Sequence, residues 1–193
     1  MVEYEYLKKF NMQLRFLLFY VLLLLALPAI SQNKIKWTSW DVASEKIQKG
    51  NKKFLIYFYY DGCKWCRYME ETTLSSDHIS KFINQNFYAF KVNALSSDKI
   101  VADKAYTSVR IGKYDFHELA AELLAGNMSF PSIAFLNEQF KKIGSYDSYV
   151  DEHNFEMILS FYAGDHHKHT MWRRFANNYC RDSHFNSMVN DKK

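Results

Sequence analysis

The chain has 193 residues, of which 48% are hydrophobic and 24% charged, and its formal net charge is +4. This length suits one domain with a proper core but is short for two, and the composition excludes a disordered chain. Residues 1–31 hold three lysines or arginines and two glutamates, so the remainder carries +3. A charge this small gives no reason to expect nucleic acid or an anionic membrane as a partner.

A nearly unbroken apolar run at 16–30 lies close to the N-terminus. The run is short for a membrane span of about 20 residues, and it ends in Ala29-Ile30-Ser31, a small-x-small pattern that signal peptidase recognises. We therefore expect a signal peptide at 1–31, cleaved before Gln32, and a periplasmic or secreted protein. An uncleaved N-terminal membrane anchor is the alternative. Translation from Met12 would give a shorter and more ordinary signal peptide.

Hydrophobic periodicity divides the rest of the chain into alternating strands and helices. The first half of the pattern predicts a short strand at 35–37, a helix capped by Thr38 with Asp41 and ended by Gly50, a strand at 54–60, and a helix opened by Cys63-Lys64-Trp65-Cys66. A helix from Ser76 or Asp77 and a strand at 87–92 follow. The second half predicts a helix marked by Asp115 and Glu118 and ended by Gly126, a hairpin of strands 132–136 and 140–143, and a helix carrying Phe155, Ile158, Leu159 and Tyr162.

The strand at 54–60 has no polar alternation, which suits a strand buried on both faces. Helices must then cover both sides of the sheet, so the predicted class is three-layer α/β. Residues 94–114 lack a regular pattern and are interpreted as an insertion within one domain at 32–163. The polar segment 164–193 is expected to be a tail that docks through Trp172 and Phe175 and frays at its end.

Cys63 and Cys66 form a C-x-x-C motif at the predicted junction of a strand and a helix. The positive end of the helix dipole and free backbone N–H groups stabilise a thiolate at that position, and a thiolate is the species that attacks disulfides. A disulfide between residues three positions apart closes too small a loop to stabilise a fold much. The motif therefore favours redox chemistry over a structural staple.

With these residues the chain resembles the thioredoxin superfamily, and more narrowly the exported thioredoxin-like proteins related to the C-terminal domain of the DsbD reductant transporter. The resemblance covers 35–163 and rests on four features: the aromatic strand leading into Asp61-Gly62-Cys63-Lys64-Trp65-Cys66, the following Met69-Glu70, the turn Leu74-Ser75-Ser76-Asp77, and Phe130-Pro131 before a strand. It implies a thioredoxin fold with a central mixed sheet and a thiol–disulfide oxidoreductase that works without a cofactor.

The resemblance also implies a direction and partners. It favours reduction of disulfides in exported proteins, with electrons supplied by a membrane or periplasmic thiol donor. A monomer is expected, since no coiled-coil or dimerisation segment is evident. The Lys64-Trp65 pair between the cysteines does not by itself fix a reduction potential.

Roles for individual residues follow from the motif and the resemblance. Cys63 is expected to be the exposed nucleophile, and the more buried Cys66 to resolve the mixed disulfide. Lys64 adds positive charge, and Trp65 offers an apolar substrate contact or is simply an exposed loop side chain. Phe130 and a cis Pro131 are expected to hold the substrate strand, as the fold implies. An ordinary trans proline at a strand start is the alternative.

One position departs from the thioredoxin pattern. Thioredoxins place a buried aspartate six residues before the first cysteine, and this chain has Tyr57 there. A phenol is a poor base at neutral pH. Glu70 occupies a position where DsbD-type domains also have a glutamate, and it lies four residues after Cys66, on the same helix face. Glu70 is therefore the expected proton relay if it is partly buried, and an ordinary solvated glutamate if it is not.

Two other functions remain open on the sequence alone. The first is a binding module that holds an extracytoplasmic partner in the groove near Phe130 and Pro131, with Tyr106 and Tyr114 of the insertion as contact surface. The second is a disulfide isomerase, which would normally require dimerisation.

The remaining candidate groups favour plain interpretations. Cys180 is expected to be a free thiol, with an intermolecular disulfide as the alternative. The histidines at 166, 167 and 169 are interpreted as a solvated turn rather than a metal tract, and no second C-x-x-C or histidine pair completes a zinc site around Cys63 and Cys66. No metal is expected.

Overall fold

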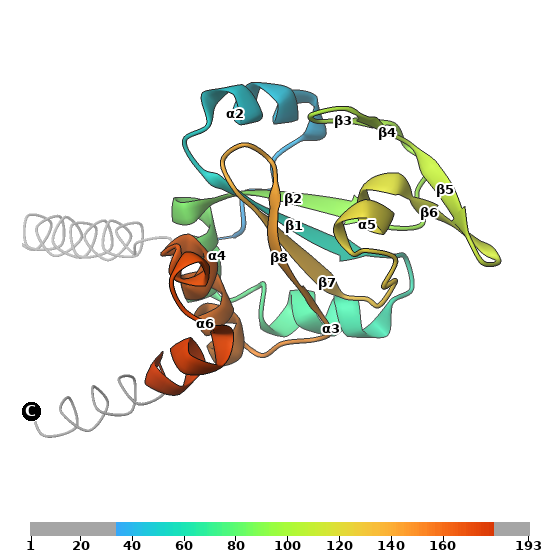
Figure 1. The fold of residues 1–193 in the computed structure, drawn as a ribbon. Coiled ribbons are helices and arrows are strands. Elements are labelled where there is room, and N and C mark those ends of the chain that lie inside the picture. The colour runs from blue at the N-terminus through green and yellow to red at the C-terminus, as the bar shows by residue number, and fades with distance from the viewer. Residues whose placement is uncertain (1–33, 180–193) are drawn as a thin grey trace, which may run out of the picture. The chain divides into compact units, whose positions relative to one another are not determined.

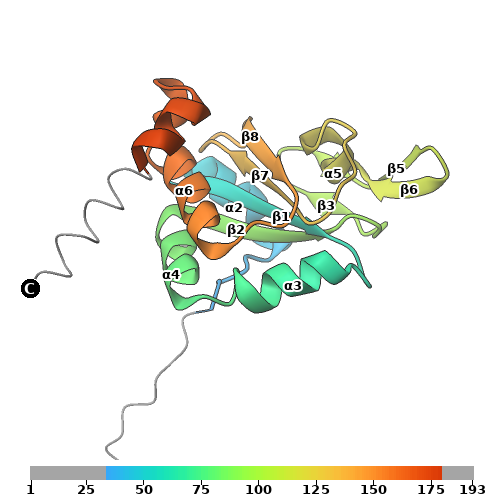
Figure 2. The same ribbon diagram turned by 90° about the horizontal axis from the view of Figure 1, so that it is seen from below.

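The computed structural model describes residues 34–179 of the chain (Figures 1 and 2). The predicted signal peptide and Cys180 lie outside these residues. Among the described residues, no helix combines the length and apolar character needed to cross a membrane.

A four-stranded mixed sheet forms the centre of the fold, in the order β2-β1-β7-β8. Its strands are β1 (Lys53–Tyr59), β2 (Phe87–Asn93), β7 (Ser132–Leu136) and β8 (Lys142–Asp147). β1 pairs with β2 in parallel and with β7 antiparallel, and β7 and β8 form the predicted hairpin. The mixed sheet confirms the fold class expected from the sequence.

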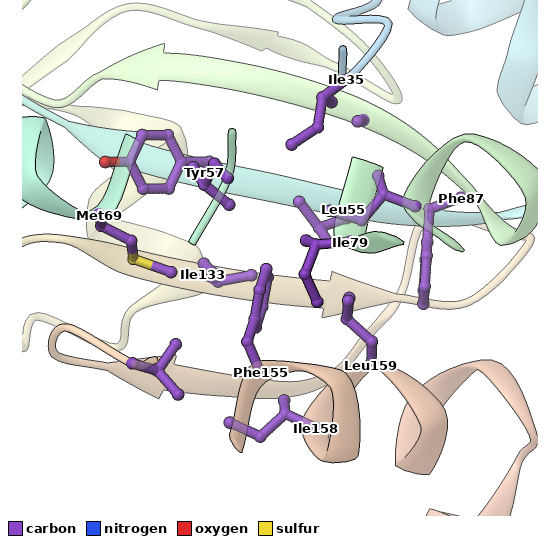
Figure 3. Packing of buried hydrophobic residues seen from close by; sticks show 14 of the residues in the cluster. Ile35, Leu55, Tyr57, Met69, Ile79, Phe87, Ile133, Phe155, Ile158 and Leu159 are labelled. Carbon is purple, nitrogen blue, oxygen red and sulfur yellow. The ribbon is translucent and has the colours of Figure 1, made fainter. Parts of the chain in front are cut away.

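Helices cover both faces of this sheet (Figure 1). They are η1 (Trp40–Val42), α2 (Ala43–Lys49), α3 (Lys64–Thr72), α4 (Asp77–Asn86), α5 (Glu118–Leu123) and α6 (Glu152–Ala163). Alternate side chains of β1 point to opposite faces. Leu55 and Tyr57 pack with α3, α4 and α6 in one core (Figure 3), while Phe54, Ile56 and Phe58 pack with α2 and α5 in the other.

The N-terminal elements differ from the sequence prediction. Residues 35–37 make only an isolated bridge between Trp37 and Ala89, not a strand. Thr38 is not the helix cap, and its backbone N–H donates to the carbonyl oxygen of Ala89 at 2.7 Å. The cap is Ser39, whose hydroxyl accepts the N–H of Asp41 at 3.4 Å.

The hairpin also begins its second strand later than predicted. Phe140 adopts a left-handed conformation, with φ of 61°, in the turn between β7 and β8. Its ring is buried edge-on against Phe54, with 5.1 Å between ring centroids. An apolar residue at 140 therefore belongs to the turn, and pairing begins at Lys142.

The segment 94–114, predicted to be irregular, contains three short strands, and a fourth begins at its last residue. β3 (Ile100–Val101) pairs with β4 (Ala105–Tyr106), and β5 (Ser108–Ile111) pairs with β6 (Tyr114–His117). Asp115 lies within β6 and does not start the following helix. Tyr106 is buried and its hydroxyl donates to Asp103 at 2.8 Å, whereas Tyr114 is exposed. Tyr106 therefore cannot belong to a contact surface.

His117 caps α5 from a completely buried position. Its Nδ1 accepts the N–H of Leu119 at 3.2 Å, and Nε2 lies 3.1 Å from the carbonyl oxygen of Asp98. Nδ1 must be unprotonated to accept this bond. Burial lowers the pKa of His117 below its usual value, although the Asp98 carbonyl opposes this.

We expect His117 to make stability fall in mild acid. The unfolded chain binds a proton at this histidine more readily than the folded chain. The contribution of His117 to the free energy of unfolding is therefore fully present above the ordinary pKa of about 6.5 and is lost as the pH falls below it. Protonation removes the cap, worth about 1 kcal/mol. Urea midpoints at pH 7 and pH 5 test this against His117→Asn, which keeps a capping group without the titration. An equal pH dependence in both proteins would contradict it.

The C-terminal part of the described chain packs against α6. After η2 (His166–Lys168), residues 172–179 are helical, and Trp172 and Phe175 both contact the ring of Phe161 at 5.3 and 5.1 Å between centroids. The buried ammonium of Lys53 lies 3.2 Å from Asp165 and so ties β1 to this region.

Candidate active site

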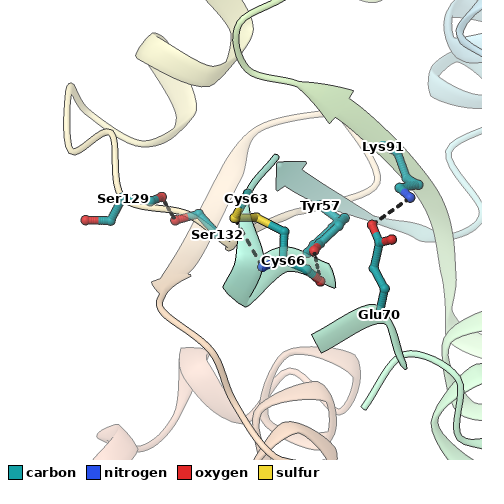
Figure 4. The surroundings of a disulfide bond; sticks show 7 residues. All are labelled: Tyr57, Cys63, Cys66, Glu70, Lys91, Ser129 and Ser132. Atoms are coloured by element: carbon teal, nitrogen blue, oxygen red, sulfur yellow. Dashed lines mark hydrogen bonds and ion pairs between the residues drawn. A yellow bond between two sulfur atoms is a disulfide. The ribbon is translucent and has the colours of Figure 1, made fainter. Parts of the chain in front are cut away.

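Cys63 and Cys66 form a disulfide at the start of α3 (Figure 4). The turn between β1 and α3 requires Gly62, whose φ of +84° disfavours other residues. Cys63 is the N-cap of the helix, and its Sγ accepts the backbone N–H of Cys66 at 3.1 Å. The cap places this sulfur where the free N–H groups and the helix dipole favour a thiolate once the disulfide is reduced.

Cys63 is more buried than the sequence suggested. Cys63 is 6% exposed and Cys66 is 2% exposed. Cys63 is the more accessible of the two residues, but in the disulfide form it is not the exposed side chain that the sequence analysis expected. A partner must therefore approach Cys63 closely along a restricted path.

The charges on α3 favour an anion at its N-terminus. The helix has no acidic residue in its first turn and begins instead with Lys64, against the preference set by the helix dipole. Lys64 is exposed, and Trp65 is 61% exposed. The positive end of α3 is thus left without a counter-charge from its own first turn.

The loop before β7 lies on the other side of the disulfide from Tyr57 (Figure 4). The Phe130–Pro131 peptide bond is cis. Ser132 donates its hydroxyl to the carbonyl oxygen of Ser129 at 2.6 Å, which closes the loop around the proline. Phe130 is half-buried, with its ring edge-on to Tyr60 at 5.7 Å between centroids.

Tyr57 is buried beneath the redox pair. Its hydroxyl donates to the carbonyl oxygen of Cys66 at 3.1 Å. Burial raises the pKa of this phenol well above its ordinary value, and the nearby Glu70 charge adds to the shift. Tyr57 therefore fixes the backbone of α3 but cannot take up a proton at neutral pH.

Glu70 is only partly buried, with a side chain that is 36% exposed. Its carboxylate forms an ion pair with Lys91 on β2 at 2.8 Å (Figure 4). The structure thus gives Glu70 a cationic partner and contact with water, which the sequence did not indicate.

Lys91 is a site residue that the sequence analysis missed. It lies beside Tyr57 in the parallel register of β1 and β2. Its ammonium is 5.4 Å from the ring centroid of Trp37, 5.7 Å from that of Tyr57 and 4.7 Å from that of Tyr59. Such contacts stabilise a partly desolvated cation. The available signal was a single lysine in the otherwise apolar run 87–92.

The structure provides no cluster of metal ligands in the part that it describes: within 34–179, no three His, Cys, Asp or Glu side chains gather as a metal site requires. His166 lies against the ring of Phe175, and His167 against that of Phe161. These two histidines face aromatic rings rather than a common point.

A mixed sheet covered by helices on both faces, with a C-x-x-C disulfide at the start of a helix and a cis proline before a strand, defines a protein of the thioredoxin fold. Residues 40–163 match the family described as Thioredoxin-like domain, and the chain belongs to that family. The membership confirms the superfamily assignment, while the narrower relation to DsbD-type domains stays a prediction.

One curated protein and two solved structures are similar to this chain, and the two structures support the fold. The chain is 25% identical over 145 residues to the uncharacterized protein B0495.5 of Caenorhabditis elegans, a match covering 75% of this chain but only 18% of that protein. A thioredoxin-fold protein from Helicobacter pylori is 17% identical with a TM-score of 0.54, covering 68% of this chain and 86% of that one. The DsbH oxidoreductase is 17% identical with a TM-score of 0.50, covering 70% and 89%.

Proposed function

We propose that the protein is a thiol–disulfide oxidoreductase that reduces disulfide bonds of exported proteins. The observation that carries the proposal is the Cys63–Cys66 disulfide at the N-terminus of α3, with the cis Pro131 loop beside it. The similarity to DsbH, whose name describes an oxidoreductase, supports the same class of reaction.

The reaction starts from the reduced pair. A dithiol donor passes two electrons and two protons to the Cys63–Cys66 disulfide, which becomes two thiols, and the donor itself becomes a disulfide. Cys63 loses its proton, and its thiolate attacks one sulfur of the substrate disulfide. The substrate S–S bond breaks, a mixed disulfide forms, and the released substrate thiolate takes up a proton.

Cys66 completes the exchange. Its thiolate attacks Sγ of Cys63, breaks the mixed disulfide and releases the second substrate thiol. The substrate gains two electrons and two protons, and the Cys63–Cys66 disulfide is restored. Lys64 and the helix N-terminus favour the Cys63 thiolate, Glu70 takes the proton of Cys66, and Phe130, Pro131 and Trp65 hold the substrate near Cys63.

The setting of the reaction is part of the proposal. Export through the segment at 1–31 would place the protein in the periplasm or outside the cell, with disulfide-bearing exported proteins as substrates and a membrane or periplasmic thiol protein as electron donor. The protein is proposed to act as a monomer.

The reduction potential of the Cys63–Cys66 pair tests the direction. We expect a value near that of thioredoxin, about −270 mV, measured by equilibration with thiol–disulfide buffers and alkylation of free thiols. A value near −120 mV would instead make the protein an oxidant. An active enzyme should have a Cys63 thiol that alkylating reagents modify well below about pH 8. If the reduced Cys63 does not react in that pH range, the result would favour a binding module without redox activity.

A further inference from the structure

Three aromatic side chains form a continuous surface beside the disulfide. Trp65 and Tyr68, on α3, are 61% and 47% exposed. Tyr149 is half-buried in the loop between β8 and α6. The ring centroids are 6.0 Å apart for Trp65 and Tyr68, 5.8 Å for Trp65 and Tyr149, and 5.1 Å for Tyr68 and Tyr149. An exposed cluster of this kind is typical of an interaction site. We call these three residues the aromatic surface.

The loop that carries Tyr149 is fixed on both sides. The backbone N–H of Ser148 donates to the carbonyl oxygen of Pro131 at 3.0 Å. The hydroxyl of Thr73, just after α3, donates to the carbonyl oxygen of Val150 at 2.7 Å. Tyr149 is thus held between the cis proline loop and α3, so little conformational entropy is lost when a ligand packs on it.

Unpaired positive charge lies on the same side of α3. Lys64 and Arg67 are exposed among the aromatic side chains, and neither has an ion-pair partner in the described part of the chain. Of the acids nearest in sequence to the sulfurs, Glu70 pairs with Lys91, and Asp61 accepts a hydrogen bond from Asn93 at 2.8 Å, which holds its carboxylate toward the end of β2 but leaves its charge in place.

One acid on the helix, Glu71, has no ion-pair partner within residues 34–179. Glu71 is exposed, eight residues beyond Cys63, which is about 12 Å along a helix. Glu71 is four residues after Arg67, on the same face of the helix, but seven residues from Lys64, about 10 Å along the helix. It therefore offsets part of the charge of Arg67, while Lys64 and the helix dipole keep the end of α3 next to the sulfurs positive.

We infer that the aromatic surface, with Lys64 and Arg67, binds substrate segments that carry an aromatic side chain and an acidic side chain next to the cysteine. The inference rests on the proposed function and names its substrate class. The aromatic side chain packs on Trp65, Tyr68 and Tyr149, and the acidic side chain pairs with the two cations. A basic segment is repelled at the same place.

Two matched peptides test the preference without relying on the reaction. Both carry tryptophan and a serine in place of the cysteine, and they differ only in having two glutamates or two lysines beside that serine. We expect the oxidised full protein to bind the acidic peptide about tenfold more tightly at low ionic strength, and the difference to shrink below about twofold at 0.5 M salt. Fluorescence anisotropy of labelled peptides measures both affinities.

Variants assign the effect to the proposed residues. Lys64→Gln with Arg67→Gln should remove the preference for the acidic peptide, and Tyr149→Ala should weaken binding of both peptides about fivefold. Lys81→Gln removes a distant exposed charge on α4 and should preserve the tenfold ratio. Equal affinities for the two peptides in the wild-type protein, or a ratio unchanged in the double variant, would overturn the inference.

A separate assay distinguishes the two proposals. Reduction of hydroxyethyl disulfide, which is small and uncharged, measures the redox pair without the surface. If the protein reduces this compound but binds both peptides equally, the proposed function is supported and the inference about the aromatic surface is wrong. If the protein prefers the acidic peptide but does not reduce this compound, the inference about the aromatic surface holds and the proposed function is wrong. The aromatic surface would then belong to a binding module.

Discussion

Replacing Cys63 with serine should abolish the reduction of insulin disulfides by the purified protein, leaving only the uncatalysed rate. The hydroxyl of serine has no accessible anionic form at neutral pH, so no thiolate stands at the N-terminus of α3 to attack a disulfide. Cys66 cannot substitute, because it is the more buried residue of the pair and lies within the first turn of α3 rather than at its N-cap. Turbidity of precipitating insulin chains measures the rate.

Cys66→Ser is the matched variant with a different expected result. It keeps the first attack but lacks the group that resolves the mixed disulfide, so a covalent adduct should accumulate at one equivalent per protein. Mass spectrometry under non-reducing conditions detects the adduct, and dithiothreitol should release it. Both variants are best made with Cys180→Ser, which removes the third cysteine. Insulin reduction by Cys63→Ser would refute the mechanism.

The central part of the fold followed from the sequence because local pattern and burial agree there. The strand predicted at 132–136 matches β7 because four of its five residues are apolar and all five are buried. Elements at the margin were harder to predict. Phe140 looks like a strand residue from its apolar character alone, yet a left-handed backbone conformation places it in a turn. Only its packing against Phe54 explains why a large apolar residue is placed there.

The site was predictable where chemistry depends on sequence spacing and unpredictable where it depends on strand register. The C-x-x-C motif sets its own geometry, so the position of Cys63 at the N-terminus of α3 follows from the motif and the turn. Lys91 is 28 positions after Cys63, and its contact with Glu70 exists only because β1 and β2 pair in parallel with Tyr57 beside Lys91. Nothing in a single sequence fixes that register.

Glu70→Gln should slow the second step of the reaction, attack by Cys66, about a hundredfold. Cys66 must lose a proton before it attacks, and a positioned general base contributes about 10²–10⁴ in rate. Tyr57 cannot accept this proton, because burial raises its pKa and its hydroxyl already donates to Cys66. Glu70 is four residues from Cys66 on the same helix and is partly open to water. Stopped-flow release of a substrate thiol from a preformed mixed disulfide measures this step.

Lys91→Gln distinguishes a base from a structural ion pair. This variant breaks the 2.8 Å contact with Glu70 but keeps the carboxylate. If Glu70 takes the proton of Cys66, Lys91→Gln retains most of the rate, because the carboxylate is still present. The rate of Glu70→Gln should in turn rise steadily with pH, as hydroxide replaces the missing base. An equal loss of rate in both variants, with unchanged pH profiles, would mean that the pair only supports α3 against β2 and that the proton of Cys66 leaves through water.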